Sequence, residues 1–206
     1  MYVERYLQAF PGHPFAGHAI VYWEHSTVAA PEHIAVLEAL GMKVLRVGAR
    51  GKDFIALDTE NMTRDHLRYL RKQVDAAARK YGGRPHPDGS GRVLITIDGE
   101  DYVLLGATSS DGDGDRSVIV DETGRFWRGD VTTAVAAETL GAEAFVQSLT
   151  GNEDARAYLK GHGVTFIDSS VGSPYHVYLM RQHLRANPAA RIAGGEVNGG
   201  LFLGPN

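Results

Sequence analysis

The stretch AIVYWEHSTVAAPEHIAVLEALGMKVLRV, residues 19–47, decides the class of fold to which this chain belongs. It opens with five apolar or aromatic residues in a row, AIVYW (19–23), and closes with the largely apolar run MKVLRV (42–47). Runs of this length and composition are typical of strands buried in a sheet. We therefore expect a strand at each end of the stretch.

The segment between these two strands has the pattern of a helix. Ser26 or Thr27 offers a start signal with Pro31 close behind it, and Gly41 offers a stop signal. One face of the predicted helix is apolar, formed by Ile34, Leu37 and Leu40. The stretch as a whole predicts a strand–helix–strand unit, which is the building block of α/β folds.

The alternation of helices and strands continues along the chain. A helix is expected at 64–81, a loop at 82–91, two strands joined at Asp98-Gly99, and a hairpin at 117–127 that turns near Thr123-Gly124. The second half repeats the pattern, with helices expected at 131–140, 153–160 and 175–185 and strands at 144–149, 164–169 and both ends of 190–204.

The predicted fold class is α/β, with two consecutive mixed α/β units of three layers, in which helices pack on mostly parallel sheets. We place the units at 1–118 and 119–206, with a hinge near residue 118. A chain of 206 residues is long enough for each unit to bury a core of its own.

Composition narrows the classes of function. The net charge is −4 and no basic stripe stands out, so we expect no nucleic-acid partner. The sequence has no cysteine, which excludes disulfides, thiolate metal sites and a cysteine nucleophile. No signal peptide and no apolar run of about 18 residues is found, so we expect no membrane partner and a cytoplasmic location.

Three aspartates stand at alternate positions in SSDGDGDRSVIVDETG, residues 109–124. Asp111, Asp113 and Asp115 would repel one another unless a positive charge neutralised them. Glycines between them allow a loop to turn every second carboxylate inward, and Mg²⁺ or Ca²⁺ prefers such oxygen ligands. The alternatives are a divalent metal site and a solvated acidic turn.

A calcium loop of the EF-hand kind is a further alternative, because the three aspartates and Glu122 fall at its first, third, fifth and twelfth positions. Arg116 occupies the sixth position, where that loop needs a glycine. The flanking residues also read as strands, whereas the EF-hand needs helices. Both observations speak against calcium.

Three motifs in this order resemble the α-D-phosphohexomutases, in particular the bacterial phosphomannomutase/phosphoglucomutase branch. They are DGDGDRSVIVDETG (111–124), SSVGSPYHVYLM (169–180) and GGEVNGGLFLG (194–204). The opening residues, 2–45, look like the end of that family's first domain running into its second. The resemblance covers nearly the whole chain and is weaker over 82–105, where strand-like residues look inserted.

The resemblance implies which part of the enzyme this chain represents. The family fold has four domains around a cleft, and 1–118 would correspond to the second domain and 119–206 to most of the third. We find neither the family's phosphoserine loop nor its C-terminal phosphate-binding domain in this sequence. The isolated chain is therefore expected to be inactive unless the missing N- and C-terminal domains act as partners.

The resemblance also implies the chemistry, which is transfer of a phosphoryl group between the 1- and 6-positions of a hexose phosphate. Mg²⁺ held by Asp111, Asp113 and Asp115 would neutralise charge on the moving group. Arg116 would be a catalytic residue that supports the phosphate or the loop. The alternative for Arg116 is a simple counter-ion for the aspartates.

The motif GGEVNGG matches the family's sugar-binding loop, which implies substrate contacts from Glu196, Asn198 and Gly199. Asn198 stands where the family usually has serine, and its amide still offers a donor and an acceptor. A plain hairpin turn is the alternative, because Asn-Gly is itself a turn signal.

In the motif at 169–180, Ser170 and Ser173 stand where the family tends to have a lysine or histidine for the substrate. We expect Ser173 to be the N-cap of the next helix, before Pro174, with an anion site at that helix start as the alternative. His25 and Ser26 are expected to serve a helix start rather than form a nucleophile and base. The rival to an enzyme is a non-catalytic module that binds a sugar phosphate or metal, or a complementing subunit.

Overall fold

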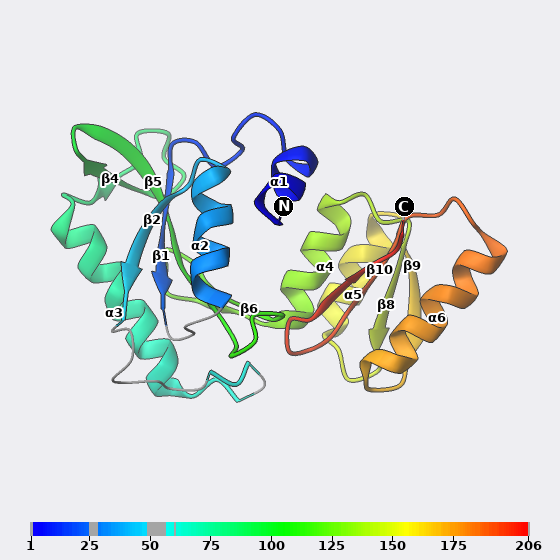
Figure 1. The fold of residues 1–206 in the computed structure, drawn as a ribbon. Coiled ribbons are helices and arrows are strands. Elements are labelled where there is room, and N and C mark those ends of the chain that lie inside the picture. Colours follow the sequence, from blue (N-terminus) through cyan, green and yellow to red (C-terminus); the bar gives the residue numbers. More distant parts are fainter. Residues whose placement is uncertain (1, 25–28, 49–56, 60, 206) are drawn as a thin grey trace. The chain divides into compact units, whose positions relative to one another are not determined.

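A computed structural model describes residues 2–24, 29–48, 57–59 and 61–205 (Figure 1). The chain divides into two compact units, one made of Met1–Gly114 with Val118–Phe126 and the other of Asp115–Ser117 with Trp127–Asn206. Each unit contains its own sheet. The assignment of 1–118 and 119–206 to the second and third domains of the family stays a prediction.

The first unit is built on a seven-stranded sheet. β1 runs parallel to β2 on one side and to β5 on the other, while β4 pairs antiparallel with β5 and β3 with β4. β6 extends the sheet from β5 and pairs with β7. The elements are α1 (Tyr2–Ala9), β1 (His18–Trp23), α2 (Ala29–Ala39), β2 (Lys43–Val47), α3 (Arg64–Lys80), β3 (Arg84–Pro85), β4 (Val93–Ile97), β5 (Glu100–Ser110), β6 (Ser117–Val120) and β7 (Phe126–Trp127).

Helices cover both faces of this sheet. Ala19, Val21 and Trp23 of β1 share a buried cluster with Leu70 and other residues of α3. Tyr22, which points to the opposite face, packs against α2. Figure 1 accordingly shows α2 and α3 on either side of β1 and β2. The predicted strand–helix–strand unit at 19–47 is therefore confirmed, with three layers.

The predicted joints in this unit are largely confirmed. Asp98 and Gly99 link β4 to β5 in an antiparallel hairpin, both with positive φ (53° and 86°), as a tight two-residue turn requires. Two elements were not predicted: α1, and the two-residue strand β3 inside the expected loop at 82–91. Ser26, Thr27 and His25 lie outside the described residues, so the expected start signal of α2 is not tested.

The second unit is built on a four-stranded sheet in the order β11-β10-β8-β9. β8 runs parallel to β9 and to β10, and only the edge strand β11 is antiparallel to its neighbour. The elements are α4 (Gly129–Thr139), β8 (Ala144–Ser148), α5 (Glu153–Gly161), β9 (Thr165–Ser169), α6 (Ser173–Ala186), β10 (Ile192–Gly195) and β11 (Leu201–Leu203). All of them lie close to the predicted ranges.

Alternate residues of β8 face different helices. Phe145 packs with α4 and α5 in one buried cluster, whereas Val146 packs with Met180 of α6 in another. Figure 1 shows α6 on one side of β8 and α4 and α5 on the other. The second unit is thus also a three-layer α/β structure. In the part of the chain that the structure describes, no helix combines the length and the apolar character needed to cross a membrane.

Candidate functional site

The three predicted aspartates lie together in a loop that follows β5 directly. One carboxylate oxygen from each of Asp111, Asp113 and Asp115 lies within 4.8 Å of the others. Asp111 is buried and the other two are exposed. Three negative charges this close are stabilised by a cation with a preference for oxygen ligands, so the donor set fits Mg²⁺ or Ca²⁺.

Gly114 gives the loop its path. Its φ is +84°, and a Cβ at this position would lie 2.4 Å from the Cβ of Ala29 at the start of α2. The loop therefore lies so close to α2 that only glycine fits. The Gly114 N–H donates to Oδ1 of Asp111 at 3.0 Å, which orients that carboxylate.

A row of polar side chains lies beneath the aspartate loop. The Tyr22 hydroxyl is 3.0 Å from Nδ1 of His33, the Ser110 hydroxyl donates to the Asp111 carbonyl at 3.2 Å, and the His33 ring lies against Gly114, where a Cβ would come within 3.1 Å of Cε1. Burial lowers the pKa of His33, and nearby Glu32 and Gly114 offset part of that effect. Burial also raises the pKa of Tyr22, which keeps its hydroxyl protonated. Sequence analysis missed these residues.

Arg116 follows the aspartates directly, as its proposed role requires. Its Nε lies 3.5 Å from Oδ1 of Asp115, and its side chain is 31% exposed against 64% for Asp115. The main chain of Arg116 also forms an antiparallel bridge with Gly200. The residue after the aspartate loop is thus attached to the turn between β10 and β11.

That turn carries the predicted sugar-binding residues. The Glu196 N–H donates to the Gly200 carbonyl at 2.9 Å, and the Gly199 N–H donates to the Glu196 carbonyl at 3.1 Å. Oδ1 of Asn198 accepts from the Gly200 N–H at 3.1 Å. The turn is therefore a closed hairpin with one amide oxygen already engaged, which means that the hairpin interpretation and a binding role are compatible.

Close packing fixes the position of this turn within the second unit. A Cβ on Gly129, the first residue of α4, would lie 2.1 Å from the Gly199 nitrogen. A Cβ on Gly200 would lie 2.8 Å from Oε2 of Glu196, so the Glu196 carboxylate lies over that glycine. Glu196 and Asn198 are half-buried, which leaves part of each side chain accessible.

The prediction that Ser173 is an N-cap is wrong. The N-cap of α6 is Gly172 with φ +117°, no side chain caps the helix, and Ser173 is its first residue. A glycine at that φ turns the chain into the helix one residue earlier than the sequence indicated. The buried His176 lies at the same helix start with its Nδ1 2.8 Å from the Gly172 carbonyl, a contact that caps none of the free N–H groups of the helix.

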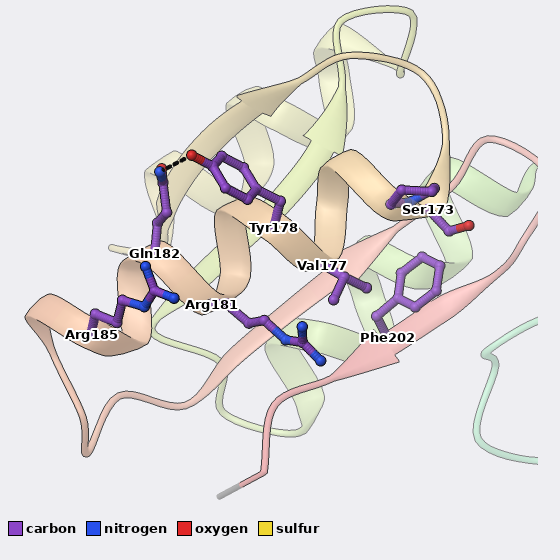
Figure 2. A pocket seen from close by; sticks show the side chains of 8 residues that line it. Ser173, Val177, Tyr178, Arg181, Gln182, Arg185 and Phe202 are labelled. Atoms are coloured by element: carbon purple, nitrogen blue, oxygen red, sulfur yellow. Dashed lines mark hydrogen bonds between the residues drawn. The ribbon is translucent and has the colours of Figure 1, made fainter.

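A groove of about 590 Å³ runs along α6 beside β11 (Figure 2). Val177 and Phe202 form its apolar part, and Arg181 and Arg185 line it one helical turn apart. Both arginines are exposed. The groove shares no residue with the aspartate loop or with the turn at 196–200, so it is separate from the candidate site.

Comparison with known proteins gives relatives along the whole chain. A phosphomannomutase from Sinorhizobium fredii is 30% identical over 205 residues, which cover 100% of this chain and 37% of the relative. A phosphoglucosamine mutase from Nitratidesulfovibrio vulgaris is 35% identical over 99 residues, or 45% of this chain and 21% of the relative. No family model matches the chain.

A solved structure supports the fold. A phosphoglucomutase/phosphomannomutase family protein from Burkholderia thailandensis aligns with a TM-score of 0.64 at 18% identity, over 98% of this chain and 38% of that one. The fold and the aspartate loop thus define an α/β protein with a carboxylate cluster whose geometry could hold a metal ion. The chain belongs to the phosphohexomutase family and spans about a third of the length of the phosphomannomutase that it matches.

Proposed function

We propose that this chain provides the metal-binding loop and the sugar-binding turn of a phosphohexomutase. The reaction is transfer of a phosphoryl group between the 1- and 6-positions of a hexose phosphate, with mannose and glucose phosphates as the candidate substrates. The observation that carries the proposal is the bridge between Arg116 and Gly200, because it joins the end of the aspartate loop to the turn of Glu196 and Asn198.

The metal assignment rests on the donor set. Three carboxylate oxygens within 4.8 Å of one another suit a hard cation, and the oriented Asp111 carboxylate adds a fixed ligand direction. Mg²⁺, when bound by Asp111, Asp113 and Asp115, would supply positive charge to the phosphoryl group in transfer.

A cytoplasmic location stays an expectation from the sequence.

The remaining residues act on the substrate. Arg116 carries a permanent charge and a forked set of donors, which suits a phosphate oxygen at the edge of the metal loop. Glu196 accepts hydrogen bonds from sugar hydroxyls, and Asn198 adds an amide on the same turn. Gly199, which has no side chain, lets the sugar approach the backbone.

Turnover requires further groups. The family resemblance implies a phosphoserine from another domain, and the matched relative is longer than this chain, which covers 37% of it. We therefore expect the 206 residues alone to bind Mg²⁺ and a hexose phosphate without turnover. The loop and the turn are each closed by hydrogen bonds within this chain, which favours binding by the isolated protein.

A non-catalytic binding module is the second candidate. It is favoured by Ser170 and Ser173, because the family tends to have a lysine or histidine for the substrate at these positions. A complementing subunit would share this chemistry but regain turnover with a partner that supplies the phosphoserine. Mixing the chain with a separately expressed phosphoserine domain of a relative distinguishes the two.

The test is calorimetry with Mg²⁺, followed by mannose 1-phosphate and glucose 1-phosphate, and an assay with a hexose bisphosphate activator. We expect binding of Mg²⁺ and of at least one sugar phosphate, with no turnover. Failure of Mg²⁺ to bind overturns the metal site. Robust turnover by the 206 residues overturns the requirement for a phosphoserine outside them.

A further inference from the structure

The polar row beneath the aspartate loop contacts the loop at Gly114. Ser110 immediately precedes Asp111, and Gly114 lies between Asp113 and Asp115. The Tyr22 hydroxyl is 3.0 Å from Nδ1 of His33, and the other edge of the His33 ring faces the Gly114 backbone, since a Cβ on Gly114 would lie 3.1 Å from Cε1 and 3.3 Å from Nε2 of His33. The row therefore links the second half of the loop to the core through two side chains, His33 from α2 and Tyr22 from β1.

The hydrogen bonds of this row have a defined direction. A backbone carbonyl only accepts, so the ring nitrogen of His33 that faces Gly114 carries the hydrogen. That nitrogen is Nε2, because Nδ1 faces the Tyr22 hydroxyl and the Nε2 edge of the ring lies next to Gly114. In the neutral imidazole, Nδ1 then accepts from the Tyr22 hydroxyl at 3.0 Å. Tyr22 is itself only 2% exposed, so its position is fixed by the core.

The loop needs such support because its three negative charges repel one another in the folded arrangement. Three carboxylates within 4.8 Å of one another repel when no cation is bound, which favours a splayed loop. Ordering a loop also costs conformational entropy for each residue, unless the protein has ordered it in advance. Residues that orient the ligands of a metal site affect its affinity, because mutating them typically weakens metal binding by about 10- to 100-fold.

We propose that His33, held by Tyr22, is a positioning residue that keeps the aspartate loop in its metal-binding shape before the metal arrives. This inference rests on the proposed function, because it takes the loop as a metal site. His33 touches the loop through the Gly114 backbone and acts through that contact. Its effect is to reduce the ordering that metal binding would otherwise have to impose.

The test compares His33→Ala, His33→Gln and Leu37→Ala in the 206-residue protein. Gln reaches far enough to donate to the Gly114 carbonyl, so it is the conservative rescue. Leu37 lies on α2, as His33 does, and packs against the buried cluster that contains Tyr22 and Ile34. Leu37→Ala therefore controls for a general loss of stability. Hydrogen exchange of the amides at 111–116 is measured without metal, and Mg²⁺ affinity is measured by calorimetry.

We expect His33→Ala to speed exchange at 111–116 and to weaken Mg²⁺ binding by about tenfold or more. His33→Gln should recover most of both effects, and Leu37→Ala should change neither by more than about twofold. Unchanged exchange in His33→Ala, or an equal change in Leu37→Ala, overturns the positioning role. A wild-type chain that binds no Mg²⁺ overturns the metal site instead, because exchange reports on the loop without metal.

Discussion

Arg116 and Gly200 pair through their main chains in an antiparallel bridge within the second compact unit. Arg116 is the residue directly after the last aspartate of the loop, and Gly200 closes the turn that holds Glu196 and Asn198. A backbone bridge transmits position better than a pair of flexible side chains, because fewer bonds can rotate. Four predictions test the aspartate loop and the turn that this bridge joins.

The first prediction concerns the metal ligands. Asp113→Asn should weaken Mg²⁺ binding at least about tenfold, because a neutral amide replaces one of three charged donors. Asp98→Asn is the matched control, since Asp98 is 88% exposed in a turn with positive φ that asparagine also adopts. Calorimetry decides the outcome, and equal affinities for Asp113→Asn and wild type would contradict the assignment.

The second prediction concerns the path of the aspartate loop. Gly114→Ala should lower the free energy of unfolding by roughly 2–4 kcal/mol, because it combines a positive φ with a contact of 2.4 Å to Ala29. Gly112→Ala is the control, since no atom lies within 4 Å of its Cβ, and should change stability by less than about 0.5 kcal/mol. Urea unfolding measures both. A similar loss of stability in the two variants would show that the packing of the loop against α2 does not require glycine at position 114.

The third prediction concerns the sugar-binding turn. Gly200→Ala places a Cβ 2.8 Å from Oε2 of Glu196, and this flexible carboxylate can move aside. We expect stability to change little while hexose phosphate binding weakens about fivefold, the equivalent of one hydrogen bond of about 1 kcal/mol. Gly161→Ala, with open space around its Cβ at the end of α5, is the control and should leave binding unchanged. Binding by Gly200→Ala at the wild-type level would argue against a substrate role for Glu196.

The fourth prediction concerns pH. Burial holds the pKa of His33 below its ordinary value of 6.5, so the unfolded chain takes up this proton before the folded chain does. The contribution of neutral His33 is therefore complete above pH 6.5 and declines as the pH falls through that value. His33→Gln removes this titration, so the stability difference between wild type and variant should shrink from pH 7.5 to pH 5.5.

Urea unfolding at the two pH values checks this prediction. The fluorescence of Trp23 reports on the first unit when the other tryptophan is removed by Trp127→Phe. His162→Gln, at an exposed position in α5's C-cap, serves as the control. A stability difference that stays constant with pH would contradict the role assigned to burial of His33.

Much of the fold was predictable because its signals are local. The helix at 64–80 keeps its apolar residues at helical spacing, and Leu70 and Val74 are indeed buried. The hairpin at Asp98-Gly99 follows from two residues that tolerate positive φ. The prediction failed at Ser173, where the positive φ of Gly172 starts the helix without a side-chain cap.

The site was predictable only in part. The three aspartates are neighbours in sequence, so their clustering could be expected from alternate spacing alone. His33 gave no signal, because its partners Tyr22 and Gly114 are distant in sequence and meet it only when α2 packs on the sheet. The close fit of Gly129 against Gly199 was equally hidden, since any short residue suits a helix start locally.

The sequence by itself determined the order of helices and strands, the carboxylate loop and the glycine-rich turn, because each depends on contacts between residues close in the chain. Only the tertiary structure decided that Arg116 pairs with Gly200 and that the His33 ring lies against Gly114. Those contacts depend on how helices pack on sheets and how strands meet. Such packing depends on the shapes of surfaces formed by distant residues, which no local pattern records.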